Sequence, residues 1–362
     1  MNVETLWLAL LGLLLAGYFV LGGYDYGAQM LHPFLREEGS LREEGSGLPR
    51  EASGGLPREA SGGAVCCERN GALDAVAPFF LGNEVWLVAF TGVLFGAFPH
   101  LEGTLLSGLY PLIVAILVGL VLGNAAVQLR GRAADARARR RWDALVVLGG
   151  ALPAVAWGLV VGLLLHGVPR RADGGFHVGL SALASPFVLA CGVTAALLFA
   201  AHGAAFVALR SAPALAARAR RLGTGLLRAT AAVGCLPVLL TLFGAGASLT
   251  NPGAAAVVTA LLAAAVAGAW WALALGHRAR AFAATCCATA LPVLLVGAGH
   301  HPYVLTSSAG FGITVREAAA DHATLVVLSG FGVVVVPLIL AYQAWSWWMF
   351  RGRTGMRHPH YF

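Results

Sequence analysis

Long apolar runs are the feature of this sequence that most limits what the chain can fold into. Nine of them follow one another along the 362 residues. A helix needs about 20 apolar residues to cross roughly 30 Å of hydrocarbon, and each run is close to that length or longer. They lie near 5–32, 76–99, 104–129, 143–165, 181–209, 226–249, 255–276, 281–299 and 321–349.

Composition agrees with a membrane protein. Hydrophobic residues make up 58% of the chain and charged residues 11%, whereas a soluble domain carries roughly a quarter charged residues. The first run lacks a basic flank and a small-residue cleavage site, so we interpret it as a span and not as a signal peptide. The sequence therefore predicts an all-α, polytopic membrane bundle of about nine transmembrane helices, forming a single membrane domain over 1–362.

Arginine indicates which loops share a side of the membrane, because the chain has no lysine. The loops after the first, third, fifth and seventh runs, with the C-terminal tail, hold 21 of the 24 basic residues. Arginine-rich loops stay in the cytoplasm, so we expect the N-terminus outside and the C-terminus in the cytoplasm. This one-sided distribution requires an odd number of spans. The net charge of +7 is then a topology signal and not a sign of nucleic-acid binding.

One segment departs from the helical pattern. Residues 36–72 hold nearly all of two tandem repeats, LREEGS/LREEGS from residue 35 and GLPREASG/GLPREASG from residue 47. Polar, glycine-rich, low-complexity sequence of this kind does not bury a core. We expect a low-complexity cytoplasmic loop between the first and second helices.

Polar groups inside the spans are the candidate functional residues, because they are costly in hydrocarbon. Asp25 lies on the first predicted span, and Asn83 and Glu84 lie on the second. Two acids on adjacent helices, without an arginine or lysine inside the membrane, are expected to share protons and water. This favours a proton relay. The alternative is that each acid is protonated and only holds neighbouring helices together.

Metal and haem ligation are not expected from this chain. The six cysteines form no CxxC pair and no histidine stands at metal-ligand spacing beside them. Haem needs axial ligands inside the bundle. Only His202 lies well inside a span, and it has no partner histidine at a similar depth. These observations alone fit a proton-coupled transporter and a respiratory subunit equally well.

A resemblance distinguishes between these two. The chain resembles subunit II of the cytochrome bd-type quinol oxidases, in blocks that follow the family's order over nearly the whole length. The blocks are GGYDYGAQML at 22–31, GNEVWLVAFTGVLFGAFP at 82–99, SGLYPL at 107–112, WD at 142–143, LLLHGVP at 163–169, SPF at 185–187, HGAAF at 202–206, HPYVLTSS at 301–308 and VVPLILAYQAWSWWMF at 335–350.

The resemblance implies a role in aerobic respiration, in a plasma-membrane complex that oxidises quinol and reduces oxygen to water. This chain would be the non-haem-ligating subunit, inactive alone, in a heterodimer whose subunit I holds haem b and haem d. The resemblance also allows for small accessory subunits and for a quinone bound as a structural ligand. The alternative is a proton-coupled transporter, or a repurposed paralogue without an oxidase role.

Residue roles follow from the matching blocks. Asp25 matches the family's first-helix acid and is expected to take up protons from the cytoplasm. Asn83 and Glu84 match the second-helix block, where Glu84 would hold water or a proton. Trp86 is expected to pack at the subunit boundary, beside an apolar oxygen route. No residue of the chain is expected to be directly catalytic.

The chain also departs from the family pattern. Leu81 stands where the family carries a further acid, and Gly123 and Gln128 replace its arginine and acid near the end of the third helix. Leucine cannot carry a proton. Either Asp25 and Glu84 suffice, or the route runs through the partner subunit.

Overall fold

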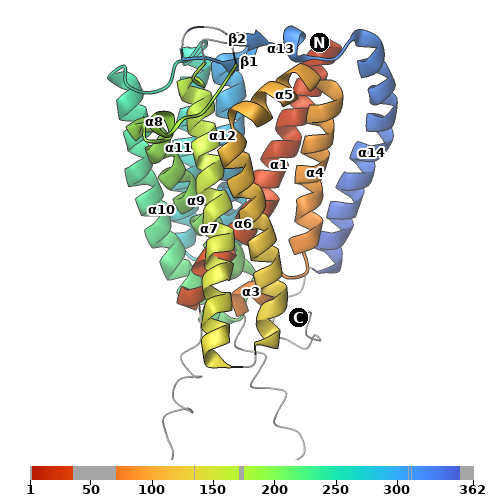
Figure 1. Ribbon diagram of the computed structural model, residues 1–362. Coiled ribbons are helices and arrows are strands. Elements are labelled where there is room, and N and C mark those ends of the chain that lie inside the picture. Colours follow the sequence, from red (N-terminus) through yellow and green to blue (C-terminus); the bar gives the residue numbers. More distant parts are fainter. Residues whose placement is uncertain are drawn as a thin grey trace, which may run out of the picture.

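The protein is an all-α bundle of long helices (Figure 1). The structure is a computed structural model and describes residues 2–35, 71–133, 135–170, 175–308, 310 and 312–350. Its long helices are α1 (Val3–Leu31), α4 (Phe80–Ala97), α6 (Tyr110–Leu129), α7 (Ala136–His166), α9 (Pro186–Arg210), α10 (Pro213–Leu242), α11 (Pro252–Ala274), α12 (Arg278–His300) and α14 (His322–Met349).

Short elements connect these helices. They are η1 (His32–Leu35), α3 (Gly71–Val76), α5 (Pro99–Gly108), η2 (Arg130–Arg132), α8 (Leu180–Leu183), β1 (Tyr303–Thr306), β2 (Gly312–Thr314) and α13 (Val315–Ala318). The strands β1 and β2 pair antiparallel, with Tyr303 opposite Thr314 and Thr306 opposite Gly312. In the described residues, eight helices are long and apolar enough to span a membrane, and there are nine if the bent pair α4 and α5 counts as one span. The predicted all-α bundle of membrane-spanning helices is therefore confirmed.

The second and third predicted spans differ from the observed helices. Pro99 follows Phe98, and a residue before proline is pushed out of helical geometry. Phe98 accordingly has φ −133° and ψ 55°, so α4 ends at Ala97. The chain bends by 120° there and continues as α5. The bounds 76–99 and 104–129 therefore become a span that begins at Phe80, a short turned helix, and a span that begins at Tyr110.

The bundle has two distinct ends (Figure 1). The hairpin end holds residue 2, α5, α8, β1, β2 and α13. The arginine end holds η1, η2 and the links from α9 to α10 and from α11 to α12. The arginine-rich loops predicted to share one side thus lie together in the described residues. The orientation of these ends in a cell stays a prediction, and residues 36–70 of the low-complexity segment lie outside the described residues.

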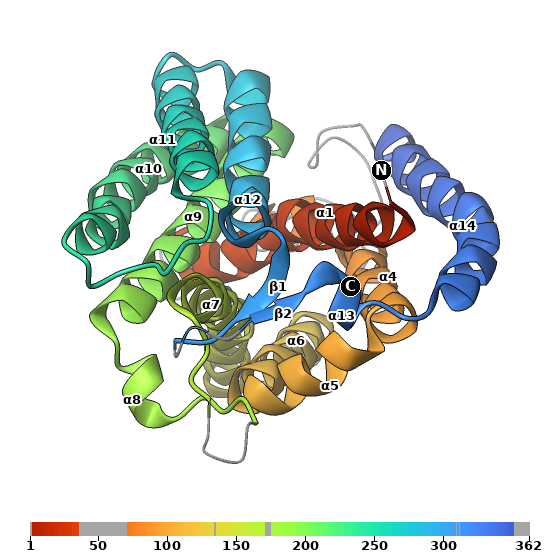
Figure 2. The same ribbon diagram turned by 90° about the horizontal axis from the view of Figure 1, so that it is seen from above.

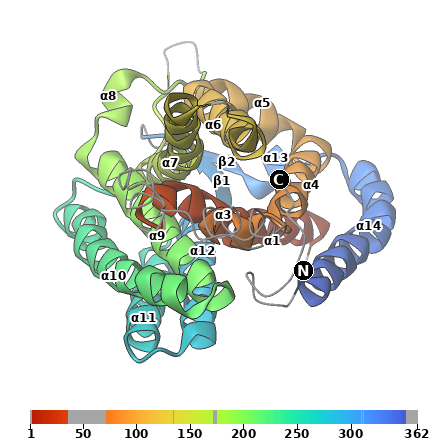
Figure 3. The ribbon, with the colours of Figure 1, turned by 90° about the horizontal axis from the view of Figure 1, so that it is seen from below.

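The centre of the bundle is α1, which packs against α4, α7, α9 and α12 (Figure 2). The crossing of α1 and α9 depends on glycine. A Cβ on Gly27 would lie 2.1 Å from the Phe199 carbonyl oxygen and 2.7 Å from Gly203 Cα. Small residues allow this close approach, which is the usual way helices associate in membranes. Seen from the arginine end, α14 and α10 lie at the periphery and α3 lies beside α1 (Figure 3).

Candidate functional site

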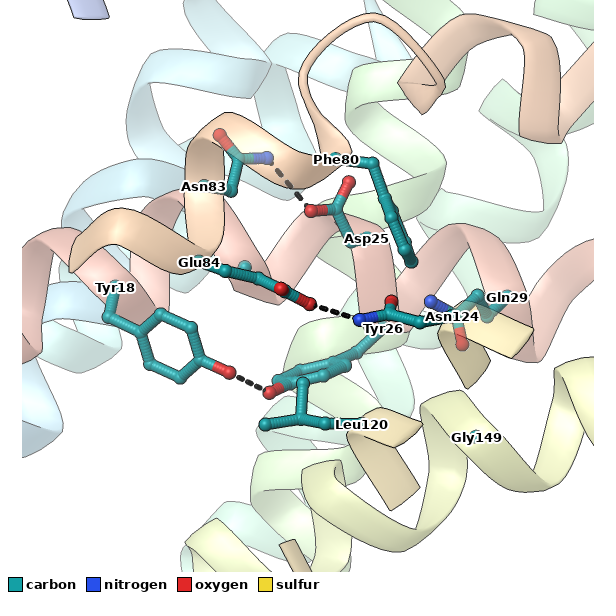
Figure 4. A pocket seen from close by; sticks show the side chains of 11 residues that line it. Tyr18, Asp25, Tyr26, Gln29, Phe80, Asn83, Glu84, Leu120, Asn124 and Gly149 are labelled. Carbon is teal, nitrogen blue, oxygen red and sulfur yellow. Dashed lines mark hydrogen bonds between the residues drawn. The ribbon is translucent and has the colours of Figure 1, made fainter. Parts of the chain in front are cut away.

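A polar pocket lies beside the C-terminal half of α1, where this helix faces α4, α6 and α7 (Figure 4). The space between its walls measures about 280 Å³ and includes space open to the outside of the chain. The structure brings three of the predicted residues, Asp25, Asn83 and Glu84, to its wall. The described residues that line it are Tyr18, Gly22, Asp25, Tyr26, Gln29, Phe80, Asn83, Glu84, Leu120, Asn124 and Gly149.

Asp25 and Asn83 form the buried part of this pocket. Asp25 is 5% exposed and Asn83 is fully buried. Asn83 Nδ2 lies 2.8 Å from Asp25 Oδ2, 2.8 Å from Tyr24 Oη and 3.1 Å from the Leu21 carbonyl oxygen. Asp25 Oδ1 has no hydrogen-bond partner among the described residues. One oxygen of the carboxyl is therefore held by α4, while the other is left to a small polar ligand such as water.

Glu84 belongs to the same pocket but has a different partner. It is half-buried, and Asn124 on α6 donates a 2.5 Å hydrogen bond to Glu84 Oε1 (Figure 4). The two acids on adjacent helices thus share one polar space, while each is bound by a separate amide. Asn124 was not singled out from the sequence. Its only signal there is an amide within an apolar run.

Two further lining groups extend the pocket along α1. The hydroxyl groups of Tyr18 and Tyr26 are hydrogen-bonded to each other. Gln29 is 2% exposed, and its Oε1 has no hydrogen-bond partner among the described residues. Tyr26 follows Tyr18 by eight residues and Gln29 follows Tyr26 by three, so the three lie close to one helix face. They form a polar line along α1 through an apolar bundle. The sequence alone does not predict Tyr18, Tyr26 or Gln29 as site residues.

Trp86 does not line the pocket. Its ring packs against Gly17 of α1, and its Nε1 donates a 3.2 Å hydrogen bond to Gln343 Oε1 of α14. It is 7% exposed, so within this chain it lies between α1 and α14. Its predicted place at a subunit boundary, beside an oxygen route, stays a prediction.

The three residues that depart from the family pattern, Leu81, Gly123 and Gln128, differ in where they lie in the structure. Gly123 is buried where α6 crosses α7, since a Cβ on Gly149 would lie 2.3 Å from Gly123 Cα. An arginine side chain has no space at that crossing. Gln128 is exposed. Leu81 belongs to α4, but its side chain lies outside the described part of the structure.

A buried ionic cluster at the arginine end was missed entirely. Asp143 Oδ1 accepts a 2.5 Å hydrogen bond from Arg130 Nε and lies 3.0 Å from His32 Nε2. His32, Asp143 and Arg130 are 2%, 7% and 9% exposed. In the sequence, the pair WD at 142–143 is only one block of the family resemblance. His32 lies 111 residues away from Asp143, so no local pattern joins them.

His202 does not fit a haem ligand. It is fully buried, its Nε2 donates to the Val20 carbonyl oxygen at 2.8 Å, and its Nδ1 lies 2.8 Å from Thr285 Oγ1. Its ring stacks on Phe282 with an interplanar angle of 2°. Both ring nitrogens are thus engaged by protein atoms. Over the described ranges, no group of three or more histidine, cysteine, aspartate or glutamate residues is arranged to hold a metal ion.

The chemistry available at the pocket is therefore proton binding. Carboxyl, phenol and amide groups exchange protons with water without a metal or a nucleophile. The pocket has room for roughly one water molecule beside these groups. No arginine or lysine is among its lining residues. The charge of either carboxylate, Asp25 or Glu84, is therefore neutralised by the proton that it binds and not by a neighbouring arginine or lysine of the lining.

Comparison with known proteins identifies the family. The family model described as cytochrome bd terminal oxidase subunit II matches residues 3–350. Cytochrome bd ubiquinol oxidase subunit 2 of Bacillus subtilis (strain 168) is 28% identical over 370 residues, covering 99% of this chain and 98% of its own. Cytochrome bd-I ubiquinol oxidase subunit 2 of Escherichia coli (strain K12) is 27% identical over 400 residues, covering 97% and 95%.

The fold agrees with these relatives. A chain in the structure of bd oxidase from Geobacillus thermodenitrificans aligns with a TM-score of 0.64 and 17% identity, over 96% of this chain and 99% of that one. The apolar helices and the bacterial relatives indicate a multi-pass bacterial membrane protein. With its match to the family model over almost the entire length, the chain belongs to the cytochrome bd terminal oxidase subunit II family.

Proposed function

We propose that this chain is the non-haem-ligating subunit of a bd-type quinol:oxygen oxidoreductase and that it delivers protons through Asp25. The family assignment supports the complex. The engaged nitrogens of His202 support a haem-free role for this subunit. Haem b and haem d in subunit I, quinol as the donor, a bound quinone and small accessory subunits stay predictions from the resemblance. The comparisons give no support to the transporter alternative.

The observation that carries the proton role is the carboxyl group of Asp25. It is almost fully buried in a span, no arginine or lysine lines its pocket, and Oδ1 is without a partner among the described residues. A purely structural acid would be expected to use both oxygens, because a buried polar atom without a hydrogen bond is costly. A carboxyl that gains and loses a proton in turn needs one oxygen accessible to a mobile donor.

Reduction of oxygen to water consumes protons, so a subunit that supplies them limits the rate without touching the haem. Asn83 holds Asp25 Oδ2, and Oδ1 has no hydrogen-bond partner among the described residues. Glu84 is a second acceptor in the same space, held by Asn124. In this scheme Asp25 is the main proton carrier, and Glu84 holds the proton or a water molecule next to it.

Replacing Asp25 with asparagine tests this function. Asp25→Asn keeps the shape and removes the exchangeable carboxyl proton, so quinol-dependent oxygen consumption by the purified complex should fall about tenfold or more. The absorption spectrum of the complex's haems should be unchanged. Glu4→Gln, which removes a carboxyl at the other end of the same helix, is the matched control and should keep full turnover.

Two results would contradict the proposal. Unaltered turnover of Asp25→Asn would remove the carboxyl from the proton route. Loss of the haem spectrum together with turnover would make Asp25 a structural residue of the subunit contact.

A further inference from the structure

The polar line on α1 does not stop at the pocket. Gln29 follows Asp25 by four residues and His32 follows Gln29 by three, so all three lie on one helical face. The backbone N–H of His32 donates to the Gln29 carbonyl oxygen, and η1 continues directly from α1. At 1.5 Å per residue, His32 lies about 10 Å beyond Asp25 along the helix axis. That direction leads to the arginine end.

The buried cluster of His32, Asp143 and Arg130 lies at the end of this series of polar residues, on the side of the arginine end. It joins η1, α7 and η2, at the end of the bundle where the arginine-rich loops meet. Asp143 Oδ1 is shared by Arg130 Nε and His32 Nε2. The cluster combines a fixed positive charge, a carboxylate and an imidazole, and imidazole is the side chain that exchanges protons most readily near neutral pH.

Gln29 lies between the two groups along the chain. It lines the pocket that holds Asp25, and its Oε1 points to the α6–α7 crossing, where a Cβ on Gly123 would lie 2.6 Å from it. The helix α7 continues from this crossing to Asp143, and α6 continues to Arg130. A 2%-exposed amide oxygen with no partner among the described residues requires a hydrogen-bond donor. A water molecule meets that need, because it donates and accepts at once.

We propose that the cluster of His32, Asp143 and Arg130 is the entrance group of the proton route to Asp25, and that Gln29 orients the water that connects them. This inference rests on the proposed function of Asp25. In each passage the imidazolium of His32 loses one proton to a chain of water molecules that Gln29 orients. The chain passes one proton to the Asp25 carboxylate at Oδ1, and His32 regains one from the aqueous side. Arg130 keeps its charge and holds Asp143 as the carboxylate that orients the imidazole.

A structural role is the competing explanation, because the same contacts tie the ends of three helices together. The two explanations differ for His32→Gln. Glutamine keeps an N–H donor for Asp143 but does not carry a proton between pH 5 and 9 as imidazole does. A structural tie is therefore largely preserved by this substitution, whereas a proton relay is broken.

The experiment measures proton uptake by the complete oxidase complex reconstituted in vesicles, with a pH-sensitive dye, during a single turnover with oxygen. His32→Gln should slow proton uptake and steady-state oxygen consumption about tenfold, with an unchanged haem spectrum and an unchanged KM for quinol. The matched control is His277→Gln, since His277 is an exposed histidine at the same end of the bundle. In a His32→Ala variant, added imidazole should restore part of the lost rate.

Gln29→Leu tests the connecting step separately, because leucine has a similar size and no hydrogen-bonding group. It should slow proton uptake without altering the haem spectrum. Normal proton uptake in His32→Gln would overturn the proposal, and so would a loss of the haem spectrum or of complex assembly in that variant. If Asp25→Asn is slow and His32→Gln is normal, the proposed function stands and the entrance is wrong. If His32→Gln is slow and Asp25→Asn is normal, the route bypasses Asp25 and the proposed function fails.

Discussion

The helices α9 and α14 are both long and apolar, yet they occupy opposite environments. In α9, 67% of the most apolar window is buried inside the chain, whereas in α14 only 6% is. The mean hydropathy of the windows has the reverse order, 1.9 for α9 and 2.5 for α14. Within a membrane the more apolar helix is therefore the one that contacts lipid or another protein. The interior position depends on small residues and polar contacts.

The reason lies in how each helix meets its neighbours. Through Gly203, α9 approaches the backbone of α1 closely. By contrast, α14 meets the core through a few side chains, such as the hydrogen bonds from Trp86 to Gln343 and from Trp7 to Ser329. Its outer face consists of large apolar side chains, and Val333 is 74% exposed. The core pair thus depends on close backbone contact, and the peripheral helix depends on separate side-chain bridges.

The largest expected effect comes from breaking the core pair. Gly27→Val would place side-chain atoms inside the Phe199 and Gly203 backbone, so α1 and α9 must separate. Overpacking of this kind costs about 1–3 kcal/mol or more, and we expect a strongly lowered melting temperature in detergent and loss of the assembled complex. Gly12→Val is the control. Gly12 lies on the same helix and, apart from its own stretch of that helix, no atom of another described residue lies within 4 Å of a Cβ built at this position. Equal stability of the two variants would contradict the assignment of the crossing.

A smaller effect is expected from loosening α14. Gln343→Leu removes the acceptor for Trp86 Nε1 and costs about 0.6 kcal/mol, the average for interhelical hydrogen bonds in membranes. The indole fluorescence of Trp86 should shift as its N–H loses its partner, with little change in melting temperature. Gln128→Leu, at an exposed glutamine of α6, should change neither. A loss as large as that of Gly27→Val would show that α14 is part of the core.

The smallest effect is confined to the hairpin end. Glu317 accepts hydrogen bonds from the backbone N–H and the hydroxyl of Thr314, which lower the pKa of this exposed carboxyl. A lowered pKa stabilises the folded state above the ordinary carboxyl pKa, and this contribution is lost as pH falls through the lowered value. Below pH about 4, hydrogen exchange should increase in α13 and the first turn of α14, but not in α9. Glu317→Gln should abolish this pH dependence, and an unchanged pH dependence in that variant would assign it to another group.

The sequence was sufficient to predict most of the spans, and to predict which of the described loops lie at the same end of the bundle. Both follow from local properties, namely the length of each apolar run and the arginine content between runs. The turn at Phe98–Pro99 was missed because a proline in an apolar run fits a kink as well as a break. Only the relative direction of α4 and α5 distinguishes the two, and that depends on tertiary packing.

The site was predictable only in part. Asp25, Asn83 and Glu84 were recognised because a polar group in a span is unusual wherever its partner lies. Gln29, Asn124 and His32 are residue types that are common at the end of a span or at a helix interface. They belong to the site only because the fold places Gln29 and Asn124 in the pocket wall and His32 beside Asp143. The contact between His32 and Asp143 joins residues from different helices. Such pairings depend on how the helices rotate and cross, which a single sequence does not specify.

The amide of Asn83 has two hydrogens and three oxygens within reach, those of Asp25, Tyr24 and Leu21. When Asp25 is charged, it attracts these hydrogens more strongly than a phenol or a carbonyl does. When Asp25 gains a proton, the balance moves toward the other two. The infrared amide bands of Asn83 should therefore shift with each proton that Asp25 gains or loses. Isotope labelling of asparagine would make this side chain a built-in indicator of proton transfer, read inside the working oxidase without an added dye.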